Sequence, residues 1–421
     1  MQNRMKCIVH IGTEKTGTTT IQDFLYHNRE LLKQKGYGVI SSVGKRNNRG
    51  LAGYAMRDDR SDDYLLANGI LTSSDKIEHD KSIEKVFEEE VGELSDSCHT
   101  ILITSEHFHS RCIHPDEIDK LKLLLEKYFE KIDIIVYLRP QVDVVTSLYS
   151  TYVRAGGTNT FDDFVLANCT KNNPYFNYDN LLSMWSASFG EERLVPRIFD
   201  KKYLLDGDLI NDFLSCMNLD GSNLQGINKS NESLTPFGQE LLRLNNIANY
   251  TFNYEGQSYK QYIYEKVNSL CIGKGCSLSS EKAYDIQKIY HDNNISVAKK
   301  WFNKHNLFDI NFEKYREFSL DASTVMMLNV LFFDQEKIHF KIEDNKNSID
   351  PFGTITNNLL KSTKKESADI LREVAFAFEK AGDIETAYKL IKQAHYLRSE
   401  GPTIKQKLDE YKYRLKNKEE R

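Results

Sequence analysis

The sequence contains no apolar run long enough to cross a membrane. Its longest apolar stretches, such as Ile132 to Leu138, are far shorter than the ~20 residues that a spanning helix needs. The segment Met1 to Lys6 is partly basic, but it leads into a short strand-like run without the apolar segment and cleavage site of a secretory signal. The sequence therefore predicts a cytoplasmic protein, neither exported nor inserted in a membrane.

A disulfide framework is missing as well. The seven cysteines are odd in number and scattered, which favours reduced thiols in a reducing compartment. Only Cys271 and Cys276 lie close together, and no second pair completes a zinc site. We expect no metal there.

The chain also lacks an excess of positive charge. Its formal net charge is −5, which argues against general affinity for nucleic acid, because a phosphate-binding surface needs clustered Lys and Arg. A local anion site built from backbone N–H groups is still compatible with this charge. At 421 residues, the chain has room for one large α/β domain and a smaller appendage.

Short apolar runs alternate with helical patterns in the first half of the chain. Strands are predicted over 6–11, 100–104, 132–138 and 194–199, and helices over 18–36, 115–131 and 142–153. This alternation predicts an α/β fold, with a P-loop-like, doubly wound parallel sheet and flanking helices. Ligands of such sheets bind at the carboxyl ends of the strands. Residues 12–20, 105–109 and 139–147 each begin where a predicted strand ends, so we expect these segments to meet in one crevice.

The most informative segment is the loop from Gly12 to Thr20. Its frame is strand, G-x-x-x-x-G and helix, which suits a phosphate because backbone N–H groups and the helix N-terminus converge on one anion. Nucleotide triphosphatases place a Lys directly after the second Gly, but this chain has Thr18 there and carries its Lys15 inside the loop. Arg139 stands where a Mg²⁺-binding Asp would be expected. The pattern therefore predicts an anion site that works without metal.

At these residues the chain resembles the PAPS-dependent sulfotransferases, PAPS being 3′-phosphoadenosine 5′-phosphosulfate. Glu14 to Thr19 (EKTGTT) is similar to their phosphosulfate loop, and Arg139 with Ser147 eight residues later is similar to their second hallmark. The stretches 178–200 and 231–234 resemble bacterial members that act on carbohydrates. The resemblance covers roughly residues 5–315.

The resemblance implies a donor and a set of roles. The 5′-phosphosulfate of PAPS would lie on the loop, whose donor-binding residues are Lys15, Thr16, Gly17, Thr18, Thr19 and Thr20. Lys15 would neutralise the charge that develops on the bridging oxygen. Arg139 and Ser147 would bind the 3′-phosphate. The acceptor would be a hydroxyl or amine of a carbohydrate or glycoconjugate, and no metal would be needed.

A hydroxyl acceptor needs a general base within hydrogen-bond reach. The candidates are Glu106 and His107, which follow the second predicted strand. Glu106 is preferred because desolvation readily raises the pKa of a carboxylate, but the choice between the two stays open. His109 is expected at the surface, and its spacing from His107 does not by itself make a metal site. Acceptor recognition is assigned only loosely, to residues 46–57, Tyr149, Tyr152 and Arg154.

The sequence predicts a sulfotransferase domain over 1–315, a connector over 316–361 and a tetratricopeptide-like helical region over 362–421. The last part is an all-α appendage in which Leu371, Val374, Ala375, Phe378, Gly382, Ala387, Ile391 and Ala394 fall at the offsets of such a hairpin. A further helix is predicted near 403–416. An ordinary helical hairpin fits equally well. These helices could recruit a protein partner.

Two other functions remain open at this point. A P-loop kinase or NTPase acting on a small molecule would need Mg²⁺ and would prefer ATP. A non-catalytic nucleotide-binding module with a helical-repeat partner site would keep the fold without turnover.

Overall fold

A computed structural model describes residues 5–227, 233–247, 253–254 and 257–317, and parts of 368–419. The chain divides into two compact units, Met1–Leu320 and Asp321–Arg421. Residues 318–361 of the predicted connector lie outside the described residues.

The first unit is built on a five-stranded, all-parallel sheet with the order β2-β3-β1-β4-β5. Its strands are β1 (Met5–His10), β2 (Tyr37–Val39), β3 (Thr100–Thr104), β4 (Phe129–Leu138) and β5 (Leu194–Ile198). The predicted α/β fold with a parallel sheet is confirmed. The strand β2 was not predicted, because three residues at a sheet edge leave almost no periodic signal.

The side chains of the central strand β1 point alternately to the two faces of the sheet, and both faces are covered. Cys7 and Val9 belong to one hydrophobic core, whereas Ile8 belongs to the other. Successive side chains of a strand point to opposite faces, so a strand buried on both sides must be apolar at nearly every position.

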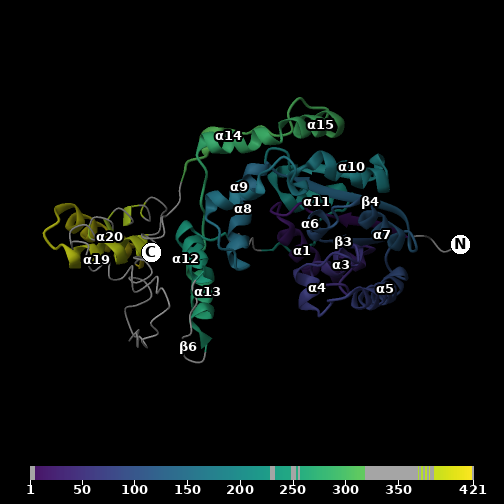
Figure 1. Ribbon diagram of the computed structural model, residues 1–421, viewed down its shortest axis with the longest axis horizontal. Helices are drawn as coiled ribbons and strands as arrows, with labels where there is room; N and C mark the ends of the chain where they lie inside the picture. The colour runs from purple at the N-terminus through teal and green to yellow at the C-terminus, as the bar shows by residue number, and fades with distance from the viewer. Residues whose placement is uncertain are drawn as a thin grey trace. The chain divides into compact units, whose positions relative to one another are not determined.

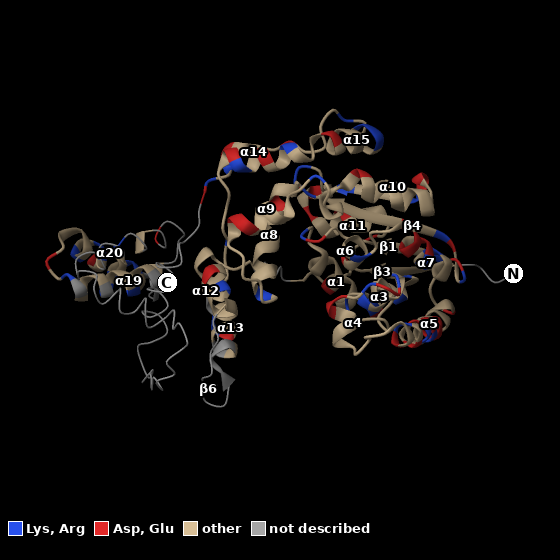
Figure 2. Cartoon of the chain, viewed as in Figure 1, with Lys and Arg blue, Asp and Glu red and all other residues tan. Residues whose placement is uncertain are grey.

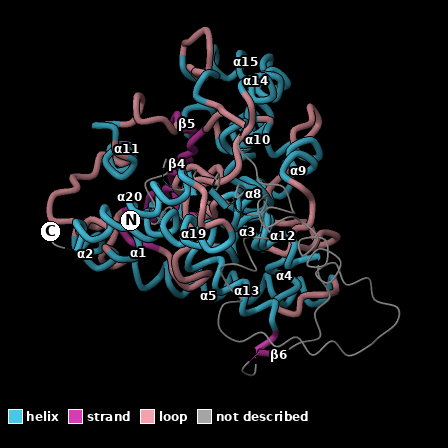
Figure 3. Tube along the Cα trace, turned by 90° about the vertical axis from the view of Figure 1, so that its left-hand side faces the viewer, coloured by secondary structure: helices cyan, strands magenta, loops and turns pink. Residues whose placement is uncertain are grey.

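Helices cover both faces of the sheet (Figure 1). The core with Cys7 and Val9 is packed by α3 (Arg49–Ala55), α5 (Ser73–Ser95), α6 (His107–Arg111), α7 (Pro115–Leu125), α10 (Tyr178–Phe189) and α15 (His291–Phe302). The opposite core is packed by α1 (Thr18–His27), α2 (Arg29–Gln34) and α11 (Leu209–Cys216). Figure 3 shows β5 with α10 on one side and α11 on the other.

Further helices and two short strands complete this unit. They are α4 (Asp63–Ala67), α8 (Gln141–Arg154), α9 (Phe161–Asn168), α12 (Pro236–Ile247), α13 (Tyr259–Leu270), α14 (Ser280–Ile289), β6 (Asn253–Tyr254) and β7 (Gln257–Ser258). Short 3₁₀ turns are η1 (Pro174–Phe176), η2 (Glu191–Arg193), η3 (Leu205–Gly207) and η4 (Phe312–Lys314).

Two predicted helices differ from the structure. The helix expected over 18–36 is interrupted at Asn28, whose buried side chain donates to Phe24 O and accepts from Gln225 N, at 3.0 and 2.7 Å. The helix expected over 115–131 ends at Leu125. Phe129 instead begins β4, because it pairs with Met5 and is buried in the core.

In the second unit, the described helices are α19 (Ile384–Leu397) and α20 (Pro402–Glu419). The helix predicted near 403–416 is thus present, with Pro402 at its first position, where a missing N–H costs nothing. Leu371, Ala375, Ala387, Ile391 and Ala394 are buried, as a helical hairpin requires. Val374, Phe378 and Gly382 lie outside the described residues, so the tetratricopeptide-like assignment stays a prediction.

Charged residues of both signs are interspersed on the outer helices, and α5 in Figure 2 is an example. Strand β4 is uncharged over the five residues that precede Arg139. Among the described residues, no helix combines the length and the apolar character needed to cross a membrane.

Candidate active site

Two glycines shape the loop that joins β1 to α1. Gly17 has φ 77° and directly precedes the helix, and a Cβ at this position would lie 2.4 Å from Leu209 Cδ2. Gly12 has φ 102°, and its Cβ would lie 3.1 Å from Glu106 Cα. Both the backbone conformation and the close neighbours therefore call for glycine. The approach of Gly12 to Glu106 brings the loop against the end of β3.

Two threonines of the loop are buried and bonded within the fold. Thr13 is buried and donates from both its N–H and its hydroxyl to Tyr137 O, at 3.1 and 3.0 Å. The hydroxyl of buried Thr16 donates to Thr13 O, so this side chain stabilises the loop itself. What Thr16 can offer a ligand is its backbone N–H.

The N-terminus of α1 is suited to an anion. No side chain in the described part of the chain caps it, and its first turn, which contains Thr18, Thr19 and Thr20, holds no acidic residue. The first N–H groups of a helix have no intrahelical partner, and the helix dipole adds partial positive charge at the same end. Thr19 is exposed and Thr20 half-buried, so their hydroxyls are accessible.

Lys15 has φ 65° and its amine donates to Thr151 Oγ1 of α8. Burial lowers the pKa of Lys15, and Arg139 and Arg154 lower it further, while Glu14 and Glu106 oppose this change. The amine thus lies in a partly desolvated site among charges of both signs.

Arg139 lies directly against the loop. Its Nη1 donates to Lys15 O at 2.8 Å, and its guanidinium lies 5.8 Å from the centre of the Phe199 ring. The Tyr178 hydroxyl donates to Arg139 O at 2.7 Å and holds the backbone after β4. These contacts place Arg139 beside the loop that joins β1 to α1.

Ser147 belongs to the face of α8 that runs past Lys15. It is half-buried and lies one helical turn before Thr151, the partner of Lys15. Residues four apart on a helix share a face. Lys15, Arg139 and the α8 face with Ser147 therefore lie close together, while the crevice expected at the strand ends stays a prediction.

Glu106 follows β3 and is held by two amides. Its Oε2 accepts from Gln22 Nε2 of α1 and from Asn47 Nδ2, the latter at 3.0 Å. Asn47 Oδ1 in turn accepts from Ser105 Oγ at 2.6 Å. The sequence pattern did not reveal Gln22, because its partner lies 84 residues away; it could be suspected only from its position on the first turns of α1.

The two histidines that follow differ from expectation. His107 is half-buried, its Nδ1 has no hydrogen-bond partner within the described residues, and burial lowers its pKa. The expected surface position of His109 is wrong, because only 3% of it is exposed. Its Nε2 lies 2.9 Å from Tyr175 O. Its ring packs at 4.5 Å from the Tyr175 ring, and burial lowers its pKa as well.

Most residues considered for acceptor recognition have structural roles instead. Arg49 is buried and bonded to Asp62, and Arg57 pairs with Asp116 at 2.5 Å. Tyr149 is 1% exposed and donates to Asn159 O. Within the described part of the chain, no group of three or more His, Cys, Asp or Glu is arranged to hold a metal ion.

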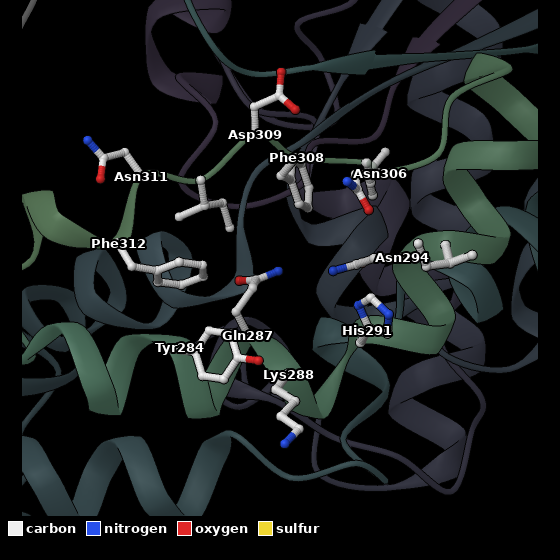
Figure 4. Close-up of a pocket in the computed structure, with 13 residues that line it drawn as sticks. Tyr284, Gln287, Lys288, His291, Asn294, Asn306, Phe308, Asp309, Asn311 and Phe312 are labelled. Atoms are coloured by element: carbon white, nitrogen blue, oxygen red, sulfur yellow. The ribbon is translucent and has the colours of Figure 1, made fainter.

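A separate cavity of about 790 Å³ lies between α14, α15 and residues 306–312 (Figure 4). Tyr284 and Phe312 line it, with ring centres 5.4 Å apart. Gln287 and Asn294 also line it, and both donate to Gln141 Oε1, at 2.7 and 3.1 Å. Since Gln141 is the first residue of α8, these amides support the helix that carries Ser147.

Comparison with known proteins adds little. No family model matches the chain. An uncharacterized protein from Archaeoglobus fulgidus is 29% identical over 120 residues, which is 28% of this chain and 30% of that protein. The crystal structure of a sulfotransferase from Alicyclobacillus acidocaldarius has a TM-score of 0.34 and 14% identity, with 53% of this chain and 86% of that chain covered. Similarities of this size establish no family, so the evidence for function comes from the site.

Proposed function

We propose that this chain is a sulfotransferase that moves a sulfuryl group from PAPS to a hydroxyl or amine of a carbohydrate acceptor. One observation supports this most: the uncapped N-terminus of α1, the Lys15 amine and the Arg139 guanidinium lie around one short loop. Such a site suits a donor with two separate phosphate groups.

The cations would act on different parts of the donor. The N–H groups of Gly17, Thr18 and Thr19 would hold the 5′-phosphate, and Lys15 would stabilise the bridging oxygen as its bond to sulfur breaks. Arg139 and Ser147 would hold the 3′-phosphate. ATP has no 3′-phosphate, so binding of this group by Arg139 would distinguish PAPS from ATP.

Glu106 is our choice for the general base. Within the described residues, its carboxylate accepts hydrogen bonds through Oε2, and Oε1 would accept from the acceptor. The acceptor oxygen attacks sulfur in line as Glu106 takes its proton, and adenosine 3′,5′-bisphosphate leaves with the bonding electrons. His107 is the second candidate, since burial keeps its imidazole neutral and able to accept a proton.

Calorimetry without added metal tests this proposal. The chain should bind adenosine 3′,5′-bisphosphate more tightly than ATP or 5′-AMP. A kinase or NTPase would instead prefer ATP and require Mg²⁺. Binding that does not discriminate between these nucleotides would refute the assignment.

A further inference from the structure

The cavity beside α14 and α15 has room for a small molecule. Its volume of about 790 Å³ lies within the range of about 300–1,000 Å³ that is usual for ligand sites. The described residues that line it include none from the loop of residues 12–20, nor Glu106 or Arg139. A ligand in this cavity therefore goes beyond the proposed reaction.

Three amide side chains form a fixed network at the inner wall of this cavity. Gln141 Nε2 donates to Phe176 O at 3.1 Å and to Asn294 Oδ1 at 2.9 Å, so both of its N–H groups are used. Gln141 Oε1 accepts from Gln287 Nε2 at 2.7 Å and from Asn294 Nδ2 at 3.1 Å. Gln141 is completely buried, whereas Gln287 and Asn294 line the cavity.

Gln287 and Asn294 each keep one N–H group for a ligand. A side-chain amide nitrogen has two N–H donors, and within the described residues each of these nitrogens makes one hydrogen bond, to Gln141 Oε1. Because both nitrogens bond the same oxygen, they lie close together. Figure 4 shows both amides directed toward the middle of the cavity. Two neighbouring N–H donors match the two oxygens of a carboxylate, as the paired donors of Arg do.

The charged residues of the cavity also favour an anion. The carboxylate of Asp309 is already paired with Lys202 at 2.7 Å, and it accepts from the Tyr203 hydroxyl at 2.5 Å. Lys288 lines the same cavity, and it makes no ion pair or hydrogen bond within the described part of the chain. The described lining therefore offers an unpaired cation and no unpaired carboxylate.

Apolar and aromatic side chains make up the rest of the lining. The ring centres of Tyr284 and Phe312 are 5.4 Å apart, and the two rings are inclined at 78°. Aromatic faces and edges of this kind pack well against another flat ring. The apolar lining consists of Tyr284, Ile295, Leu307, Phe308, Ile310 and Phe312.

We propose that this cavity binds a small aromatic carboxylate. Its two oxygens accept from Gln287 Nε2 and Asn294 Nδ2, and Lys288 balances its charge. Its ring packs against Tyr284 and Phe312. Hydrogen bonds to a charged acceptor are stronger than those to a neutral one, so the carboxylate is preferred to the corresponding amide.

Ligand-observed NMR titration of the full chain tests this site. The probes are 3-phenylpropionate and 2-naphthoate, with their neutral counterparts 3-phenylpropionamide and 2-naphthamide. We expect saturable binding of at least one carboxylate. The amide of the same compound should bind about tenfold more weakly or less, because it carries no charge and has a single acceptor oxygen.

Two variants test the residues assigned to the carboxylate. Gln287→Glu keeps the shape of the side chain but places a negative charge beside the ligand, and should weaken carboxylate binding about tenfold or more. Lys288→Glu reverses an exposed charge and should weaken it about three- to tenfold. Lys299→Glu is the matched control, since Lys299 is an exposed lysine of α15 that does not line the cavity. It should leave the affinity within about twofold of wild type.

Thermal melting shows whether each variant is folded. If Gln287→Glu fails to fold, Lys288→Glu decides alone, because its side chain is exposed and has no bond to lose within the described residues. The proposal is overturned if neither carboxylate binds saturably, if the amides bind equally well, or if Lys288→Glu binds as wild type does. A loss in Lys299→Glu as large as that in Lys288→Glu would also overturn it, since binding would then follow the overall charge.

Discussion

Replacement of Arg139 by alanine tests most directly whether this residue binds the 3′-phosphate of the donor. Among the residues that the structure describes, the guanidinium makes one hydrogen bond, to Lys15 O at 2.8 Å. Its remaining donors are assigned here to the 3′-phosphate. A hydrogen bond to a charged group contributes about 1.5–3 kcal/mol, and ~1.4 kcal/mol corresponds to a factor of ten. Affinity for adenosine 3′,5′-bisphosphate should therefore fall about 10- to 150-fold.

The same substitution also removes the hydrogen bond from Arg139 to Lys15 O, which holds the loop, and this should lower the affinity for every nucleotide. A hydrogen bond within the protein contributes about 0.5–1.5 kcal/mol, so affinity for 5′-AMP should fall only about 2- to 10-fold. Calorimetry with both nucleotides gives the two ratios. Arg46→Ala is the control, since Arg46 is half-exposed and pairs with Asp23 at 2.6 Å. An equal loss of affinity for the two nucleotides would show that Arg139 does not bind the 3′-phosphate.

Four further predictions concern Lys15, Glu106, the buried His10 and the second unit. Lys15→Ala should lower kcat about 10²- to 10³-fold, as loss of one donor to a developing oxyanion does, and near-normal turnover of radiolabelled PAPS would exclude its role at the leaving oxygen. Glu106→Gln keeps the shape of the side chain and should lower kcat by ~10²-fold or more with unchanged bisphosphate affinity; a normal kcat would shift the base to His107. His10 is fully buried, and its pKa is lowered from 6.5 to about 3 in the folded protein. As the pH falls below 6.5, His10 takes up a proton in the unfolded state but not in the folded state, so the free energy of unfolding decreases. In urea titrations between pH 6 and 4, His10→Asn should reduce this pH slope by about 1.4 kcal/mol per pH unit, and an unchanged slope would contradict a neutral His10. Deletion from Ser362 onward removes part of the second compact unit and should leave bisphosphate affinity within about twofold; loss of binding would mean that the two units depend on one another.

Much of the fold follows from local pattern. Four of the five strands of the sheet were predicted, because a strand buried on both faces is apolar at nearly every position. The short edge strand β2 was not, and the break at Asn28 was not either. Asn28 interrupts the helix through a bond with Gln225, which is 197 residues distant, and no local signal reports such a partner.

The sequence by itself determined the strand, loop and helix around residues 12–20, which we propose as the anion site, because glycine spacing, the cation at Lys15 and the following helix are neighbours along the chain. It also indicated Arg139, Ser147 and Glu106, since ends of parallel strands meet at one edge. Only the tertiary structure decided which atoms are left for chemistry: Gln22 and Asn47 occupy one oxygen of Glu106, and His109 is buried against Tyr175. The reason is physical. Backbone conformation depends mainly on adjacent residues, whereas burial and side-chain partners depend on segments that folding brings together from far apart in the sequence.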